Sequence, residues 1–264
     1  MRPPRKNREI IFVSFSGIDG AGKSTQIEAL CARLKEDGLQ VLLIRFWDDI
    51  ARLTGLREAT GHTIFKGDKG VGSPSAPINR RDKNVRSWLM TGVRLFLYFF
   101  DAIAVRLAVG RAIRSGADLV IFDRYIYDEL ANLTLSNPAI RVYVSMIMKI
   151  VPKPDISYLL DADPVKACAR KPEYPIEFLH SNRQSYLDLC KLVGEITVIA
   201  PMPIREVERT VLRYVLNELS FRAPRLESGG DMASKGSDDE PAELERQQDV
   251  LPPLDAEQLR PRQT

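Results

Sequence analysis

The chain has few cysteines and almost no net charge, and both features exclude classes of protein. Cys31, Cys168 and Cys190 are the three cysteines among 264 residues. They are odd in number and unclustered, which favours core thiols in a reducing cytoplasm over a disulfide framework. The formal net charge of +3 is too small to indicate a nucleic acid as partner.

An uninterrupted hydrophobic run long enough to cross a membrane is also missing from the sequence. The longest apolar stretch, residues 95–109, contains Asp101 and Arg106. A membrane span tolerates such charges poorly, so we expect a buried helix there. The basic opening from Arg2 to Arg8 is followed by a strand-like run, not by the apolar region and cleavage site of a secretory signal. We therefore expect a cytoplasmic protein with no membrane partner.

One motif carries most of the functional information. Residues 17–24 read Gly-Ile-Asp-Gly-Ala-Gly-Lys-Ser and fit the phosphate-binding pattern G-x-x-x-x-G-K-[ST]. An apolar, β-rich run at 10–15 precedes them. A helical pattern from Lys23 to Lys35 follows, and Gly38 is placed to end it. Because the motif requires this strand–loop–helix setting, the sequence predicts that the chain binds a nucleoside triphosphate.

Each part of this loop has a physical role. The glycines let successive backbone N–H groups point at phosphate oxygens, and the helix N-terminus adds its positive end. Lys23 is predicted to reach the β- and γ-phosphates, and the Ser24 hydroxyl to ligate Mg²⁺. The predicted nucleotide-binding residues are Gly17, Ile18, Asp19, Gly20, Ala21, Gly22, Lys23, Ser24 and Thr25.

Four more strand-like runs follow the first. They lie at residues 41–46, 119–122, 156–160 and 197–200, and helical patterns separate them. Each is short and apolar at nearly every position, which is typical of a parallel sheet covered on both faces. The sequence therefore predicts an α/β fold with a doubly wound five-stranded parallel sheet sandwiched by helices. Ligands are expected at the carboxyl ends of the strands.

A second motif follows the predicted strand at 119–122. Asp123 ends this strand, beside the phosphate loop, where it can hold Mg²⁺ directly or through water. Arg124 can pair with phosphate oxygens in a bidentate manner. The alternative is a structural ion pair at a strand end.

These motifs together resemble the thymidylate kinases, a branch of the nucleoside-monophosphate kinases. The resemblance rests on residues 17–25, on Asp123-Arg124-Tyr125 and on the segment 154–164, and it covers residues 9–215. It implies a P-loop NTPase fold of the nucleoside-monophosphate kinase type and phosphoryl transfer from Mg²⁺·ATP to a nucleoside monophosphate, with dTMP as the leading acceptor. Two other interpretations stay open: a P-loop kinase acting on another small-molecule acceptor, and a nucleotide-binding regulatory module.

The resemblance also implies a role for each site residue. On the donor side, Lys23 would stabilise charge on the transferring phosphoryl group, while Ser24 and Thr25 would serve Mg²⁺ and the ATP phosphates. Since thymidylate kinases are usually dimers, a homodimer is implied too, and the apolar run at 95–109 offers a face for it.

On the acceptor side, Asp19 would face the sugar, and Asp123 and Arg124 would complete the metal and phosphate clamp. Arg45 would bind the acceptor phosphate, or it is a solvated charge at a strand end. Arg170 would close over the phosphates as part of a short lid, or it is a solvated charge at a helix end.

The sequence departs from the family's pattern at the positions that contact the acceptor in that family. Phe46-Trp47-Asp48-Asp49 follows Arg45 in place of Glu-Pro-Gly-Gly, and Ala102 stands where the family has an arginine near the base. Residues 126–132 lack the polar pair that contacts thymine.

The aromatic residues Phe96, Tyr98, Phe99 and Phe100 offer a stacking surface or, at helical spacing, pack in the core. Four cations at 79–86 could receive an anionic acceptor or form a solvated face.

The composition also predicts the domain organisation. Beyond residue 222, Ser, Gly, Pro, Glu and Gln dominate and aromatic residues vanish. Such a segment cannot bury enough apolar surface to offset its ordering entropy. We predict a P-loop kinase domain over residues 1–221 and a disordered tail over 222–264. The glycine- and charge-rich stretch 47–84 is long for a connection, which is typical of functional or disordered loops.

Overall fold

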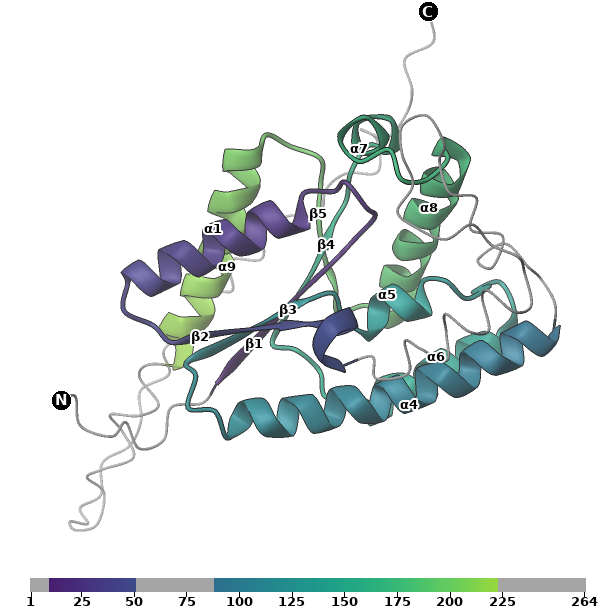
Figure 1. Cartoon of the computed structure of the whole chain (residues 1–264), viewed down its shortest axis with the longest axis horizontal. Coiled ribbons are helices and arrows are strands. Elements are labelled where there is room, and N and C mark those ends of the chain that lie inside the picture. Colours follow the sequence, from purple (N-terminus) through teal and green to yellow (C-terminus); the bar gives the residue numbers. More distant parts are fainter. Residues whose placement is uncertain (1–9, 51–87, 223–264) are drawn as a thin grey trace, which may run out of the picture. The chain divides into compact units, whose positions relative to one another are not determined.

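A five-stranded parallel sheet organises the computed structural model, which describes residues 10–50 and 88–222 (Figure 1). The strand order is β2-β3-β1-β4-β5, and every neighbouring pair is parallel. The strands are β1 Ile11–Ser16, β2 Val41–Arg45, β3 Leu119–Asp123, β4 Ile156–Leu160 and β5 Thr197–Ile199. The predicted α/β fold is thus confirmed.

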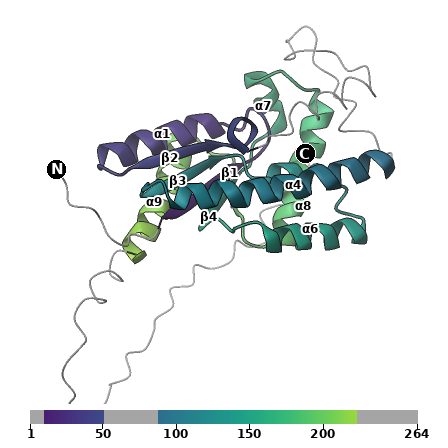
Figure 2. The same ribbon diagram turned by 60° about the horizontal axis from the view of Figure 1, so that its bottom comes forward.

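Helices cover both faces of this sheet (Figures 1 and 2). They are α1 Lys23–Glu36, the π-helix η1 Phe46–Ile50, α4 Trp88–Ile113, α5 Ile126–Leu130, α6 Pro138–Ile150, α7 Pro164–Arg170, α8 Ile176–Val193 and α9 Ile204–Arg222. Apolar residues of α1 and α9 pack together on one face. Those of α4, α5, α6 and α8 pack on the other.

The strands supply both halves of the core because successive side chains point to opposite faces. On β3, Leu119 and Ile121 face the α1/α9 side, whereas Val120 and Phe122 face the α4 side. All four side chains are fully buried. This is why the strands read as continuous apolar runs in the sequence.

Strand boundaries follow local chemistry, and they differ from the sequence prediction by one residue at β1, β2, β3 and β5. The second strand was expected to include Phe46, but it ends at Arg45, whose N–H donates to the Asp49 carboxylate at 2.7 Å. Phe46 instead opens η1 and is fully buried. Asp163 caps α7, since its Oδ1 accepts from the N–H groups of Val165 and Lys166.

A carboxylate at the amino end of β4 joins the first strand to the last helix. Asp155 Oδ2 accepts the Phe12 N–H at 2.7 Å, and Asp155 Oδ1 accepts from Arg222 Nη2 at 2.5 Å. Arg222 is the last residue of α9. This clamp lies at the end of the sheet opposite to the carboxyl ends of the strands.

Several predictions concern segments outside the described residues. These are the basic opening, the cationic segment 79–86, most of the stretch 47–84 and the tail beyond Arg222. Within the described ranges, none of the helices has the length and hydrophobicity needed to cross a membrane.

Candidate active site

The phosphate loop is held against two neighbouring segments by direct backbone contact. Gly17 has a φ of +141°, and a Cβ there would lie 2.5 Å from the Leu160 carbonyl oxygen at the end of β4. Gly20 has a φ of +80°, and a Cβ there would lie 2.4 Å from the Ala167 carbonyl oxygen of α7. Only glycine satisfies both the conformation and the space at these positions. The glycines of the motif therefore also seat the loop between β4 and α7.

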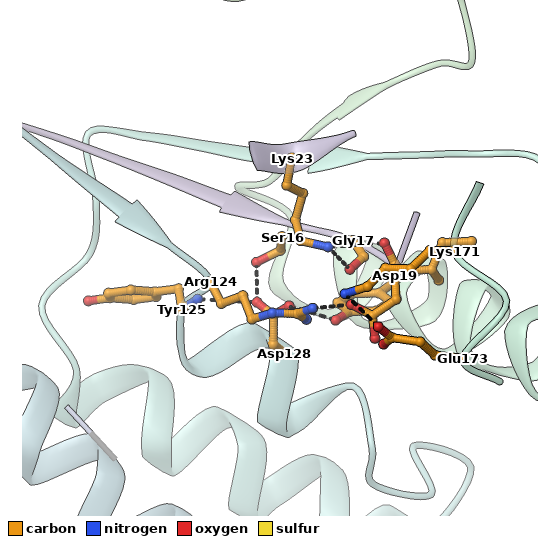
Figure 3. A network of polar contacts seen from close by, with 11 residues as sticks. Ser16, Gly17, Asp19, Lys23, Arg124, Tyr125, Asp128, Lys171 and Glu173 are labelled. Carbon is orange, nitrogen blue, oxygen red and sulfur yellow. Dashed lines mark hydrogen bonds and ion pairs between the residues drawn. The ribbon is translucent and has the colours of Figure 1, made fainter. Parts of the chain in front are cut away.

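Lys23 lies at the centre of this loop. Its side chain is buried, and Nζ donates to the carbonyl oxygens of Gly17 and Ile18 at 2.8 and 3.0 Å (Figure 3). Burial, followed by the nearby charge of Arg124, lowers the pKa of Lys23 to about 8. The two carbonyl contacts and the carboxylates of Asp19, Asp128 and Asp123 offset this effect only in part, so an incoming anion would gain from pairing with the ammonium group.

Ser24 and Thr25 lie in the first turn of α1, and both are exposed. Gly22 precedes them as the N-cap with a left-handed backbone, so the first N–H groups of a 14-residue helix face the loop. A helix N-terminus of this kind favours negative charge.

Arg124 reaches the loop from the turn after β3. Its φ of +69° is positive, unlike that of any other non-glycine residue in the described ranges, and its N–H donates to the Phe15 carbonyl oxygen at 3.0 Å. Its guanidinium forms ion pairs with Asp19 of the loop and, at 3.1 Å, with Asp128 of α5. Burial acts to lower the pKa of Arg124, but the Asp128 and Asp19 carboxylates outweigh it and raise that pKa.

Asp128 was not predicted as a site residue, and it has the most hydrogen bonds in this cluster. The side chain is buried and accepts from Ser16, Arg124 and Tyr125 (Figure 3). It also accepts from the Tyr186 hydroxyl. The sequence held one signal, the pair of carboxylates Asp128 and Glu129 in an otherwise apolar segment after Arg124. It held none for Tyr186, which lies 58 residues further along the chain.

The structure brings some predicted residues together and leaves others apart. Asp123 is in register with Phe15 of β1 and with Arg45 of β2, so all three lie at the carboxyl edge of the sheet. Arg45 is exposed at this edge. Arg170 is exposed on the last turn of α7, where its Nε donates to the Lys166 carbonyl oxygen. Its helix nevertheless contacts the phosphate loop through Ala167.

Two further ion pairs lie near α7. Lys171 and Glu173, just after α7, pair at 3.3 Å and belong to the network drawn in Figure 3. Arg183 of α8 binds both carboxylate oxygens of Asp161, at the end of β4, at 2.6 Å each. The sequence gave no indication of the Arg183–Asp161 pair, which fixes α8 to the strand next to Gly17.

The aromatic residues expected to pack in the core are divided. Tyr98 is buried, and so is Ala102, which stands at the position of the family's arginine. Phe96, Phe99 and Phe100 are 60%, 36% and 42% exposed, so core packing is wrong for these three residues. They lie on an outward face of α4.

The residues present fit Mg²⁺ bound through phosphates. Nowhere in residues 10–50 and 88–222 do three or more His, Cys, Asp or Glu side chains group as a metal site. The site offers instead the exposed Ser24 hydroxyl and the Asp123 carboxylate. Mg²⁺ commonly keeps several waters and takes one or two protein ligands plus substrate phosphates, so this small donor set suits it.

Relatives of the chain are thymidylate kinases. It is 26% identical over 222 residues to a probable thymidylate kinase of Archaeoglobus fulgidus, covering 80% of this chain and 98% of the relative. It is 31% identical over 191 residues to a thymidylate kinase of Bifidobacterium longum, covering 68% of this chain and 83% of the relative. The chain belongs to the thymidylate kinase family.

Two further comparisons accompany this family membership. The solved thymidylate kinase of Ehrlichia chaffeensis matches 78% of this chain and 98% of its own length, with a TM-score of 0.48 and 21% identity. No protein-family model matches the sequence.

Replacing Gly20 by alanine tests the seating of the loop. The new Cβ would meet the Ala167 carbonyl oxygen at 2.4 Å, in addition to the cost of a positive φ. We expect Gly20→Ala to lower the free energy of unfolding by about 2–4 kcal/mol in urea denaturation.

Gly116→Ala is the matched control. Gly116 has a φ of +74°, but nothing lies within 4 Å of its added Cβ. In the Gly116→Ala variant the free energy of unfolding should therefore fall by only about 1–2 kcal/mol, which is the cost of the left-handed conformation. Equal losses in the two variants would show that the loop does not contact α7 as described.

Proposed function

We propose that this chain transfers the γ-phosphoryl group of ATP to a nucleoside monophosphate, with dTMP as acceptor and dTDP and ADP as products. The observation that carries the proposal is the convergence of Lys23 and Arg124 on one glycine loop. Lys23 lies within the loop, and Arg124 reaches it from the end of β3 and pairs with Asp19. The relatives are thymidylate kinases, and this name supplies the acceptor.

The donor side follows from the phosphate loop. Backbone N–H groups of residues 17–25 cradle the ATP phosphates, and Lys23 neutralises charge on the β- and γ-phosphates. Ser24, with Asp123 directly or through water, holds Mg²⁺. When bound, this ion neutralises charge on the phosphate oxygens and orients them.

The acceptor side comprises Asp19, Arg45, Asp123 and Arg124, with Arg170 on the lid. Arg124 is already directed at the loop, and its planar guanidinium suits a phosphate group. Arg45 is exposed at the same edge of the sheet and can bind the acceptor phosphate from the other side of Asp123. Phosphoryl transfer needs alignment and charge neutralisation more than covalent chemistry, and this set supplies both.

Two alternatives differ only in the acceptor. In the first, the kinase phosphorylates another small molecule, which the altered segment 126–132 would select. In the second, the chain binds nucleotide as a regulatory module. Both keep the donor site, so the acceptor dependence of the reaction separates them.

The decisive measurement is ADP release from Mg²⁺·ATP by the full chain, with dTMP, dUMP, other monophosphates or no acceptor. We expect dTMP to stimulate ADP release at least tenfold above the rate without acceptor. Equal rates with all monophosphates, while ATP is shown to bind, would reject dTMP as the acceptor. Stimulation by one other monophosphate would replace dTMP in the proposal without changing the donor side.

The lowered pKa of Lys23 predicts a pH dependence for ATP binding. With a pKa of about 8 in the free protein, the group is mostly neutral at pH 9. Bound phosphates favour the charged form, so ATP binding at pH 9 should take up about 0.9 proton, and the dissociation constant should rise about tenfold per pH unit above pH 8. Below pH 7 Lys23 is charged in both the free and the ATP-bound protein, so it should not change the dissociation constant with pH.

Calorimetry in buffers of different ionisation enthalpy measures this uptake. Lys23→Arg is the matched control, because arginine keeps its charge over the whole range and should abolish the uptake. If that variant binds ATP too weakly to measure, the wild-type protein is sufficient for the test. Equal heats of ATP binding in all buffers at pH 9 would contradict the prediction.

The proposal includes a cytoplasmic homodimer. The three cysteines are free, which suits a reducing compartment. One face of α4 exposes large apolar side chains at alternating spacings of three and four. We call this face the α4 stripe, and it comprises Val93, Phe96, Phe100, Ile103 and Leu107. An exposed apolar stripe of this kind is typical of a protein interface.

Light scattering tests the dimer. We expect the full chain to have the mass of two copies, and Leu107→Glu to have the mass of one, because a charge at a 56% exposed position of the stripe must be desolvated in the dimer. Lys35→Glu, on the opposite face of the sheet, should leave the dimer intact. A wild-type mass of one chain would reject the dimer.

A further inference from the structure

Asp128 has a fully occupied set of hydrogen bonds although it lies at the edge of a phosphate site. Its Oδ2 accepts from Ser16 Oγ at 2.6 Å and from the Tyr125 N–H at 3.1 Å. Its Oδ1 accepts from Tyr186 Oη at 2.7 Å and from Arg124 Nη1 at 3.1 Å. Four donors occupy most of the sites that a carboxylate offers. A carboxylate bound in this way has little acceptor capacity left for a substrate. Its role is to fix the positions of the side chains and the N–H group that donate to it.

These donors come from three separate parts of the fold. Ser16 is the last residue of β1 and immediately precedes Gly17 of the phosphate loop. Arg124 and Tyr125 form the turn after β3, and Tyr186 belongs to α8. Asp128 therefore ties the start of the phosphate loop, the Arg124 turn and α8 to one buried point.

The tyrosine is suited to remain a donor. Tyr186 is buried, and its burial, followed by the Asp128 charge, raises the pKa of its hydroxyl well above the ordinary value. The phenol therefore keeps its proton throughout the neutral range and continues to fix the carboxylate.

Arg124 binds two carboxylates that differ in their freedom. The Asp128 side chain is 2% exposed and held by three donors besides Arg124, whereas the Asp19 side chain is 18% exposed and lies on the loop itself. A phosphate arriving at the loop competes with Asp19 for the guanidinium but cannot reach the buried Asp128 pair. The Arg124–Asp128 ion pair thus persists when phosphate binds, whereas the Arg124–Asp19 ion pair can be exchanged for one with phosphate.

We propose that Asp128 is the positioning residue of this site: it holds the Arg124 guanidinium at the phosphate loop, where Arg124 exchanges Asp19 for the acceptor phosphate. This rests on the proposed function for the identity of the acceptor. The left-handed backbone of Arg124 directs the side chain toward the loop, and Asp128 holds it through the Tyr125 N–H and the guanidinium together. Preorganising a charged donor in this way lowers the reorganisation needed when phosphate binds.

Asp128→Asn tests the proposal, because it removes the charge with little change of shape. We expect the KM for dTMP to rise about 10- to 100-fold, because this range corresponds to the loss of a hydrogen bond between charged groups. The KM for ATP should change less than twofold. Tyr186→Phe removes one donor to the carboxylate and should change the same KM in the same direction, by about three- to tenfold. If Asp128→Asn does not fold, Tyr186→Phe decides on the same two constants.

Asp155→Asn is the matched control. Asp155 also accepts a backbone N–H and an arginine, but at the opposite end of the sheet. It should lower the free energy of unfolding without changing either KM. Equal rises in both KM values for Asp128→Asn, or a loss of active protein with unchanged constants, would show a structural role only and overturn the proposal.

A second readout separates failure of this proposal from failure of the proposed function. If dTMP does not stimulate the wild-type protein, the thermal shift by inorganic phosphate in saturating Mg²⁺·ADP replaces the kinetics. Phosphate should then raise the Tm of the wild-type protein and of Asp155→Asn, and raise that of Asp128→Asn by less than half as much. Equal shifts in all three proteins would overturn the role of Asp128 whatever the acceptor is.

Discussion

The close approach of the phosphate loop to β4 and α7 is the constraint on which the rest of the site depends. At Gly17 and Gly20 the neighbouring backbone oxygens leave no room for a side chain. The loop is therefore fixed by segments that lie more than 140 residues further along the chain. Because α7 also carries Arg170 and precedes the Lys171–Glu173 pair, this contact places a charged segment next to the phosphate loop.

Burial of charge is the second feature that shapes the site. Burial, and after it the charge of Arg124, lowers the pKa of Lys23, and carboxylates of the loop and of α5 offset part of this effect. Two cations thus lie at the phosphate loop: Lys23 is held by backbone carbonyl oxygens, and Arg124 by the carboxylates of Asp19 and Asp128. This arrangement makes an anionic ligand the natural complement of the cluster.

Much of the fold was predictable because its signals are local. Each strand is a short apolar run, and Asp163 before Pro164 is a local N-cap signal at the start of α7. The end of β2 was misplaced by one residue, since the apolar Phe46 reads equally well as strand or as buried helix. The exposure of Phe96 and Phe100 was also not predictable, because helical spacing tells which residues share a face but not whether that face is covered.

By itself the sequence determined the strand, glycine loop and helix of the phosphate loop, because this motif is a contiguous pattern. Asp123 and Arg124 were likewise predicted as site residues from their place after a strand. Only the tertiary structure decided which groups hold Arg124. Ser16 and Tyr186 meet at Asp128 from 112 and 58 residues away, and such partners leave no periodic or local trace in the sequence. Their meeting depends on the strand order of the sheet and on the packing of α8, which are properties of the whole fold.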